Sequence, residues 1–490
     1  MTGALDLAAV DAIFAEFWAS SPAPGLAYGV VAEGKLAHFG GLGGLTVGGL
    51  APTPDSVFRI ASMTKSFTAA ALLALRDEGL LRLDDPAASY VPVLAALRGP
   101  TSDSRPITLR DLATMSAGFP TDDAWGDRQL PLSSAEFDAV LARGLSFAHA
   151  PGTAYEYSNL GYAILGRAIA AAVGSDHRAI VTARFLQPLG MTASVFEARA
   201  VDRRHLAIGH RRDYAPEDAE AEAGASWVEL PFAGHGEFAA MGGLYSSVGD
   251  LARWIGELSD AFPARDDDEA GHPLCRASRR EMQQVHRAIP PAAPDPATDD
   301  GVGECQGLLT GGYGVGLAVA HDPVRGKLVG HPGGLPGFGS AMRWHPETGV
   351  GVVALANSTY VAAHRPVIAA LDALVAARPH GPATTLWPET LAARDNVVQL
   401  LQSWDDDLAA RIFAANVDLD EPLERRRAAA TRIRERLGGL SLDVAAPVES
   451  LSPAQLTWWM AGPGGRLRVA IALSPESPPA IQTLELTPPR

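Results

Sequence analysis

Ser62-Met63-Thr64-Lys65 opens a long apolar run that continues through residues 67–75. A segment that is apolar nearly all the way round is typical of a helix buried inside a domain rather than lying on its surface. We expect Gly79 to be the left-handed residue that ends this helix. Ser62 and Lys65 would then share one helix face, because positions i and i+3 are neighbours there.

A serine and a lysine on one buried helix face can form a nucleophile and its base. A serine hydroxyl is a poor nucleophile without an adjacent base. A lysine amine, with a usual pKa of about 10.4, is protonated at neutral pH and cannot be that base. Burial beside the positive end of a helix lowers this pKa. The alternative is a capping Ser62 and a snorkelling Lys65, since S-x-x-K is frequent by chance.

The triplet Tyr157-Ser158-Asn159 is a second candidate element. In an extended segment, residues two apart point to the same side, so Tyr157 and Asn159 would face one cleft. A tyrosine beside a lysine cation loses its proton more easily and could relay it. Asn159 could hold the lysine and donate to a substrate carbonyl. The alternative makes Asn159 the N-cap of a helix over residues 160–173 and Tyr157 a core residue.

His331-Pro332-Gly333 is the third element, followed by Gly334 and Gly337. Glycines on a strand allow a substrate backbone to approach closely. The N–H of Gly334 could be a second oxyanion donor beside that of Ser62. The alternative is a glycine-rich turn between strands, with His331 satisfied by a backbone group.

The three motifs occur in an order that resembles the penicillin-recognising serine hydrolases. This group includes class C-type β-lactamases, D-Ala-D-Ala carboxypeptidases and other penicillin-binding proteins, D-aminopeptidases and related esterases. The resemblance covers about residues 8–375. It also includes four longer stretches, at residues 107–118 (ITLRDLATMSAG), 151–161 (PGTAYEYSNLG), 241–254 (MGGLYSSVGDLARW) and 331–358.

The resemblance implies a role for each motif residue. Ser62 resembles the acylated nucleophile, Lys65 its base partner and Tyr157 the proton relay to the leaving group. Asn159 resembles the contact to the substrate amide. His331 stands where β-lactamases usually have lysine and where several D-peptidases and D-aminopeptidases have histidine.

The composition limits the partners of the chain. Its net charge of −16 argues against nucleic acid and against an anionic membrane surface. We expect a small-molecule or peptide substrate, no cofactor and no metal, because the remaining histidines form no metal-spaced pair. Residues 1–20 lack a basic leader, so we expect a cytoplasmic protein, or a periplasmic or secreted one if a leader has been removed. Cys275 and Cys305 could pair, but two reduced thiols are favoured.

The pattern of elements predicts an α+β fold of the β-lactamase/transpeptidase type over residues 1–378. An antiparallel sheet would combine residues 26–40 with strands over 313–321, 326–331, 338–345 and 350–357, flanked by helices, and residues 80–245 would form a helical lobe. Exposed insertions are expected near 213–230 and 261–308. Residues 379–394 would be a linker to a small α+β module, 395–490, that shapes the cleft or makes a homodimer.

These features predict a serine hydrolase that forms a Ser62 acyl-enzyme on an ester, amide or peptide bond, of esterase, D-aminopeptidase or D-peptidase type. The alternatives are a class C-type β-lactamase and a slow-turnover penicillin-binding sensor or scaffold. Pro332 disfavours the β-lactamase. The resemblance places there a threonine or serine that helps to bind a substrate carboxylate, and proline has neither a hydroxyl nor an N–H.

Replacing Pro332 with threonine restores that hydroxyl. We therefore expect Pro332→Thr to react faster than the wild type with carboxylate-bearing β-lactams, measured as the second-order rate of acylation by a chromogenic cephalosporin. An unchanged or slower rate would show that the missing hydroxyl is not what limits carboxylate binding.

Overall fold

The computed structural model describes residues 5–21, 23–213, 226–232, 234–269, 271–290, 310–322, 325–375 and 385–488. The chain divides into two compact units, Met1–Gly381 and Pro382–Arg490. This boundary lies inside the linker predicted from the sequence. Among the described helices, none combines the length and apolar character needed to span a bilayer.

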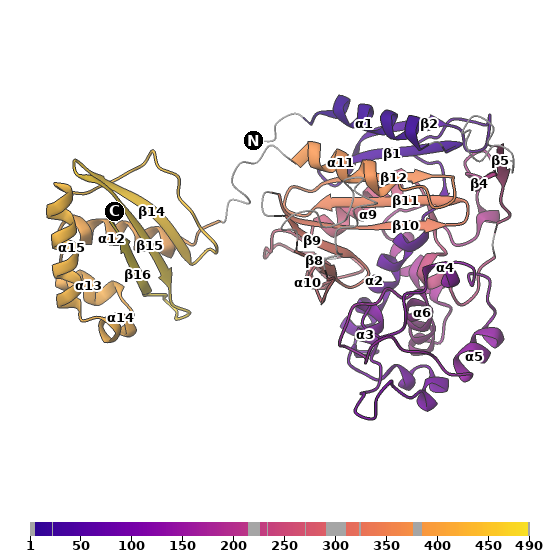
Figure 1. The fold of residues 1–490 in the computed structure, drawn as a ribbon, viewed down its shortest axis with the longest axis horizontal. Helices are drawn as coiled ribbons and strands as arrows, with labels where there is room; N and C mark the ends of the chain where they lie inside the picture. The colour runs from indigo at the N-terminus through magenta and orange to yellow at the C-terminus, as the bar shows by residue number, and fades with distance from the viewer. Residues whose placement is uncertain are drawn as a thin grey trace. The chain divides into compact units, whose positions relative to one another are not determined.

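The first unit is organised around an eight-stranded antiparallel sheet (Figure 1). Its strand order is β2-β1-β12-β11-β10-β9-β8-β7, so the first strand of the chain pairs with the last strand of the unit. Leu26 lies opposite Ala356 in this pairing. The strands are β1 Gly25–Ala32, β2 Lys35–Gly43, β7 Arg287–Ala288, β8 Thr310–Tyr313, β9 Ala318–Asp322, β10 Gly326–Leu335, β11 Phe338–His345 and β12 Val350–Ala356.

The single strand predicted over residues 313–321 is two strands, β8 and β9, separated by a turn. The turn contains Gly316 with a φ of +78°. A Cβ atom on Gly316 would lie 2.7 Å from the Lys65 carbonyl oxygen. A side chain would therefore clash there, and glycine lets the turn approach the helix that carries Lys65.

Helices cover both faces of the sheet. Helices α1 (Leu7–Ser20) and α11 (His364–Val375) pack together on one face over a core that includes Phe14 and Val352. Helix α9 (Val248–Ser259) packs on the other face, where Trp254 stacks on Phe67 at 4.2 Å between ring centroids. The sheet is therefore buried on both sides, in the manner of a layered α+β domain.

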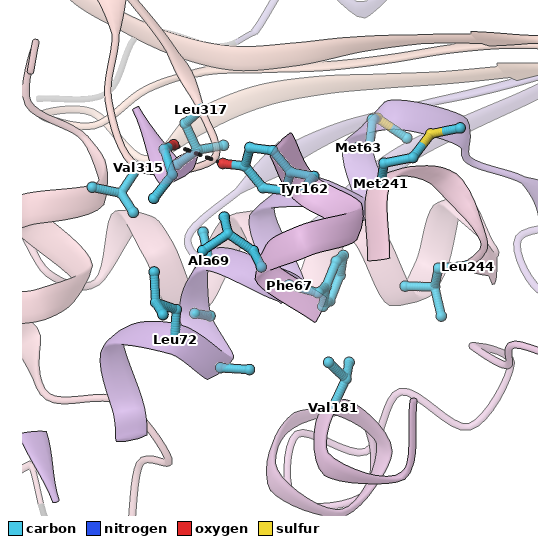
Figure 2. Close-up of a cluster of buried hydrophobic side chains, with 14 of the residues drawn as sticks. Met63, Phe67, Ala69, Leu72, Tyr162, Val181, Met241, Leu244, Val315 and Leu317 are labelled. Atoms are coloured by element: carbon cyan, nitrogen blue, oxygen red, sulfur yellow. Dashed lines mark hydrogen bonds between the residues drawn. The ribbon is translucent and has the colours of Figure 1, made fainter. Parts of the chain in front are cut away.

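The apolar run after Ser62 forms helix α2 (Thr64–Asp77), which is buried through Leu75. It begins two residues later than predicted, because residues Ala61–Met63 form a short 3-10 turn, η1. Gly79 has the predicted left-handed conformation after the helix, with φ +75°. Figure 2 shows the packing around α2, where Tyr162 of α6, Met241 of α8 and the turn after β8 converge on it.

The predicted helical lobe is built from short helices around α6 (Asn159–Val173). Its N-cap is Ser158, whose Oγ accepts from the Gly161 N–H, and not Asn159 as one prediction had it. The other elements of the first unit are β3 Phe58–Arg59, η2 Ala87–Ser89, η3 Pro92–Ala96, α3 Leu109–Ala113, α4 Asp123–Gly126, α5 Ser134–Ala142, α7 His177–Val181, η4 Thr182–Leu186, η5 Ala198–Ala200, β6 Tyr245–Ser246 and α8 Ala239–Gly242.

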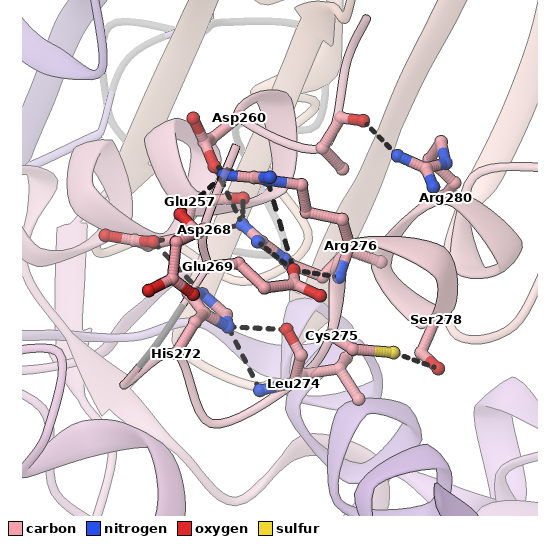
Figure 3. A network of polar contacts seen from close by, with 12 residues as sticks. Glu257, Asp260, Asp268, Glu269, His272, Leu274, Cys275, Arg276, Ser278 and Arg280 are labelled. Carbon is pink, nitrogen blue, oxygen red and sulfur yellow. Dashed lines mark hydrogen bonds and ion pairs between the residues drawn. The ribbon is translucent and has the colours of Figure 1, made fainter. Parts of the chain in front are cut away.

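The segment predicted as an insertion at 261–308 is in part an integral piece of the domain. It contains α10 (Arg276–Met282), whose Arg279 is 1% exposed. Arg279 lies 3.5 Å from the carboxylates of both Asp260 and Glu269. Figure 3 shows these two carboxylates with Arg276, which also lies within 4 Å of each of them. Asp267 and Glu269, of the acidic run that suggested an exposed insertion, thus pair with arginines of α10. Cys275 precedes α10, whereas Cys305 lies outside the described residues.

The predicted insertion at 213–230 is described only at its two ends. These form a two-stranded antiparallel pair, β4 (His210–Asp213) with β5 (Ser226–Glu229). Residues 214–225 lie outside the described part of the chain.

The second unit is an α+β module with its own core. Its four-stranded antiparallel sheet has the order β13-β14-β15-β16. Buried side chains alternate along β15, so one face of the sheet packs against helices. The elements are α12 Pro388–Gln402, α13 Asp406–Ile412, α14 Ala415–Asp420, α15 Leu423–Leu437, β13 Ser441–Leu442, β14 Gln455–Gly462, β15 Gly465–Leu473 and β16 Ile481–Thr487.

One boundary prediction in this module was wrong. Residues 388–394, assigned to the linker because of Pro388, form the first half of α12. Proline is tolerated in the first turn of a helix, where its missing N–H has no intrahelical partner to lose.

Because its core is separate, we expect residues 382–490 to fold when produced alone. Thermal unfolding followed by circular dichroism should show one cooperative transition. Trp458 is 1% exposed in that core, so Trp458→Ala should lower the free energy of unfolding by about 3–5 kcal/mol. A non-cooperative melt of the wild-type fragment would contradict an independent core.

Candidate active site

Ser62 lies in a strained turn between β3 and α2. The residue before it, Ala61, has a φ of +49°, a region that residues with a Cβ rarely adopt. The turn is held by the Ser340 hydroxyl, which donates to the Ile60 carbonyl at 2.8 Å. Strain of this kind persists only where surrounding contacts enforce it. Here it places the Ser62 hydroxyl, on a residue 8% exposed, at the edge of a cavity.

The Lys65 amine is fully buried and contacts three different segments. Its Nζ lies 3.0 Å from Ser62 Oγ, 2.7 Å from Asn159 Oδ1 and 3.0 Å from the Met241 carbonyl. Burial lowers the pKa of Lys65 from 10.5 to about 8, although the carboxylates of Asp123, Asp127 and Asp122 act in the opposite direction. About a tenth of this amine is therefore neutral at pH 7, far more than for a lysine with the usual pKa.

Tyr157 lies beside this pair. Lys65 Nζ is 4.8 Å from the centre of its ring, and its hydroxyl is hydrogen-bonded to Ser62. The prediction that the lysine would ease ionisation of the phenol was wrong. Burial and the charge of Asp123 raise the pKa of Tyr157 well above 10, and the hydrogen bond with Ser62 opposes them only in part. Tyr157 is therefore a neutral phenol, able to donate a proton and to accept one in exchange.

Asn159 lies in the first turn of α6, and its amide is held at both ends. Its Oδ1 accepts from Lys65, and its Nδ2 donates to Asp123 Oδ1 at 3.0 Å. The Asp122 carboxylate accepts from the backbone N–H groups of Asn159 and Leu160, at 2.6 and 2.9 Å. The amide donor predicted to reach a substrate is thus engaged with a carboxylate that a substrate would have to displace or share.

His331 is buried and uncharged. Its Nδ1 lies 2.5 Å from the Pro332 carbonyl, so Nδ1 carries the proton and Nε2 accepts from the Tyr313 hydroxyl at 2.9 Å. Burial, and to a smaller extent the charge of Lys65, lower the pKa of His331 to about 3. The histidine therefore supplies no positive charge to the cavity near neutral pH.

The two glycines after Pro332 approach the chain's own backbone and side chains. A Cβ on Gly333 would lie 2.5 Å from the Ile60 carbonyl, and one on Gly334 would lie 2.9 Å from the Tyr360 ring. For Gly333 this corrects the prediction of close approach by a substrate, because the neighbour is the turn that carries Ser62. Pro332 is exposed on β10, beyond the end of the pairing with β9 and opposite Ala341 of β11.

One cavity of about 420 Å³ is bordered by Ser62, Tyr157 and residues 331–334, whereas Lys65 and Asn159 do not line it. Sequence reasoning missed Asp123, Asp127 and Tyr360, which also line it. Asp123 and Asp127 come shortly after the 107–118 stretch, which carries part of the family resemblance. Their closeness to that stretch could have suggested that they belong to the site. Tyr360 lies between β12 and α11, and no sequence signal pointed to it. The described residues contain no cluster of three or more His, Cys, Asp or Glu side chains suited to a metal.

With this fold and site in place, comparison with known proteins identifies the class. The family model described as Beta-lactamase matches residues 10–377. The chain therefore belongs to the beta-lactamase family of serine hydrolases, which includes penicillin-binding proteins.

Individual relatives show what the chain is similar to. It is 33% identical over 261 residues to the D-alanyl-D-alanine-carboxypeptidase/endopeptidase AmpH of Escherichia coli K12, covering 52% of this chain and 63% of AmpH. It is 27% identical over 342 residues to protein flp of Staphylococcus aureus strain COL, covering 69% and 61%. The matches thus span less than two thirds of these relatives.

A solved structure extends the likeness of fold to both units. The octameric penicillin-binding protein homologue from Pyrococcus abyssi matches with a TM-score of 0.63, 22% identity and coverage of 99% of each chain.

If neutral Lys65 is the base, the pH dependence of hydrolysis should follow its pKa. We expect kcat/KM for an uncharged ester to rise with pH and to reach half its maximum at about pH 8, the pKa given by burial. Asp127→Asn should move this midpoint to lower pH, because the Asp127 carboxylate holds the pKa of Lys65 up. Rates must be corrected with a Ser62→Ala blank. A flat profile would exclude Lys65 as the base.

Proposed function

We propose that the chain is a hydrolase that works through an acyl-enzyme on Ser62. The observation that carries the proposal is the hydrogen bond of 3.0 Å between Ser62 Oγ and a buried Lys65 amine whose pKa is lowered to about 8. A desolvated lysine of this kind can accept the hydroxyl proton, which an ordinary lysine cannot.

In the proposed acylation, Ser62 Oγ bonds to the substrate carbonyl carbon while its proton passes to Lys65. The N–H groups of Ser62 and Gly334 would stabilise the oxyanion, each worth about 3 kcal/mol in a comparable site. Tyr157 then donates its phenol proton to the leaving oxygen or nitrogen and recovers one from Lys65. Water attacks the resulting ester, and a carboxylic acid leaves as Ser62 regains its proton.

Esters, amides and peptides are the proposed substrates, in esterase, D-aminopeptidase or D-peptidase reactions. The name of the relative AmpH supports a peptide bond. Pro332 and the uncharged His331 weigh against a β-lactam or another substrate that needs a carboxylate anchor beside the scissile bond. Slow deacylation would instead give a penicillin-binding sensor with the same first step.

Ser62→Ala should abolish turnover of p-nitrophenyl butyrate without loss of fold. Intact-mass spectrometry should show an added butyryl group on wild type, or nitrophenol release in excess of enzyme, and neither for Ser62→Ala. Ser66→Ala is the matched control. Its hydroxyl lies on the same helix but bonds to the Met63 carbonyl and Trp254 Nε1, away from the proposed chemistry.

Each result has a definite meaning. Turnover retained by Ser62→Ala, with an unchanged melting temperature, would refute the nucleophile assignment. An adduct that forms on the wild type but decays more slowly than the assay would support the sensor reaction instead.

A further inference from the structure

Apart from its histidines, the ionisable groups that form ions at neutral pH in the lining of the Ser62 cavity are carboxylates. Its lining contains two carboxylates, Asp123 and Asp127, and among the residues that the structure describes no lysine or arginine lines it. Of its two histidines, His331 is neutral because burial lowers its pKa to about 3. The Lys65 amine lies behind Ser62 and is bonded to protein groups. A negatively charged substrate would therefore enter without a lysine or arginine of the lining to receive it.

Aromatic rings form much of the remaining wall. Four tyrosines line the cavity: Tyr155, Tyr157, Tyr313 and Tyr360. Ring faces attract cations, most strongly where water is excluded. The site already contains one such contact, since Lys65 Nζ lies 4.8 Å from the centre of the Tyr157 ring. The tyrosines are a feature independent of the carboxylates, and both favour a cation.

Asp127 is connected to the proposed oxyanion donor through a single side chain. It is 6% exposed, and its Oδ2 accepts from the Tyr360 hydroxyl at 2.8 Å. The Tyr360 ring lies directly against Gly334. Arg128, outside the cavity lining, donates to the Tyr360 oxygen at 3.1 Å, and its charge lowers the pKa of Asp127 against the larger effect of burial. The Tyr360 side chain thus separates Asp127 from the expected position of the substrate carbonyl.

Asp123, the first residue of α4, is linked to the reacting groups through Asn159 of α6. It accepts from Asn159 Nδ2 at 3.0 Å, and its charge raises the pKa of both Lys65 and Tyr157. Asp122, the third carboxylate nearby, is directed to the N-terminus of α6, where it accepts two backbone N–H groups. Asp123 and Asp127 are therefore the pair that faces a substrate.

We propose that the substrates carry a protonated amine next to the scissile carbonyl, bound between Asp123 and Asp127 within the ring of tyrosines. An α-ammonium group, separated from the carbonyl by one carbon, fits this arrangement, as in an amide or ester of an amino acid with a free amino group. The inference rests on the proposed function and narrows its substrate class. It makes the two aspartates specificity-determining residues.

Competition against p-nitrophenyl butyrate tests the inference whether or not the competitor is cleaved. The competitors are D-alanine anilide, which is cationic, N-acetyl-D-alanine anilide, which is neutral, and N-succinyl-D-alanine anilide, which is anionic, with the L-forms alongside. Within the better-bound enantiomer, we expect the cation to inhibit at least about tenfold more tightly than the neutral compound, with the anion weakest.

Asp127→Asn and Asp123→Asn keep the shape and the hydrogen-bond acceptor of each side chain but remove its charge. Each should cut the preference for the cation, measured as the ratio of the two inhibition constants, at least about threefold, and the double variant should abolish it. Asp103→Asn, at an exposed acid in a loop of the same lobe, should keep the wild-type ratio. Should the buried Asp127 variant fail to fold, the exposed Asp123 variant still decides the question.

The failures of the two proposals are distinguishable. Absence of p-nitrophenyl butyrate turnover and of any Ser62 adduct would refute the proposed function. Normal turnover with equal or tighter binding of the neutral or anionic competitor would overturn only the inference about the ammonium group. Preference for the cation that survives in the Asp123→Asn, Asp127→Asn double variant would also overturn it.

Discussion

The structure depends on the burial of one amine. Lys65 has no contact with solvent, and its three hydrogen-bond partners come from η1, α6 and α8. A buried ammonium is costly unless it is paired, so the lobe and the helix that carries Lys65 must be assembled accurately for the site to exist. The same burial makes the amine a base. The stability of the site and the reactivity of Ser62 therefore both depend on the burial of Lys65.

Close backbone approaches maintain that placement from the sheet side. Gly316 allows the turn after β8 to reach the Lys65 carbonyl, and Gly333 allows β10 to reach the turn that precedes Ser62. A Cβ atom at either position would force the sheet away from α2. The strained Ala61 completes this arrangement, because its positive φ is tolerated only where β10 and Ser340 confine the chain. Packing against the turn that carries Ser62 thus explains why residue 333 is a glycine.

Local patterns in the sequence predicted the parts of the site that are themselves local. The i, i+3 spacing of Ser62 and Lys65 and the end of α2 at Gly79 follow from helix geometry, and the antiparallel sheet of the first unit was confirmed. The Met241 carbonyl and Tyr360 could not be predicted, because they reach the cavity only through tertiary contacts. The ionisation of Tyr157 was predicted wrongly because burial outweighs a neighbouring cation, and the sequence does not reveal how deeply a side chain is buried.

The carboxylates that line the cavity act on the pKa of Lys65 in the opposite direction to burial, and a cationic substrate would weaken their effect. Asp123 and Asp127 raise the pKa of Lys65 against the effect of burial, which keeps more of the base protonated in the empty site. An ammonium group bound between them would offset their field at Lys65 and repel its proton. The pKa of Lys65 would then fall as the substrate binds. A cationic substrate would thus promote formation of the neutral Lys65 amine that accepts the Ser62 proton, whereas a neutral ester would leave the lysine as it is in the free protein.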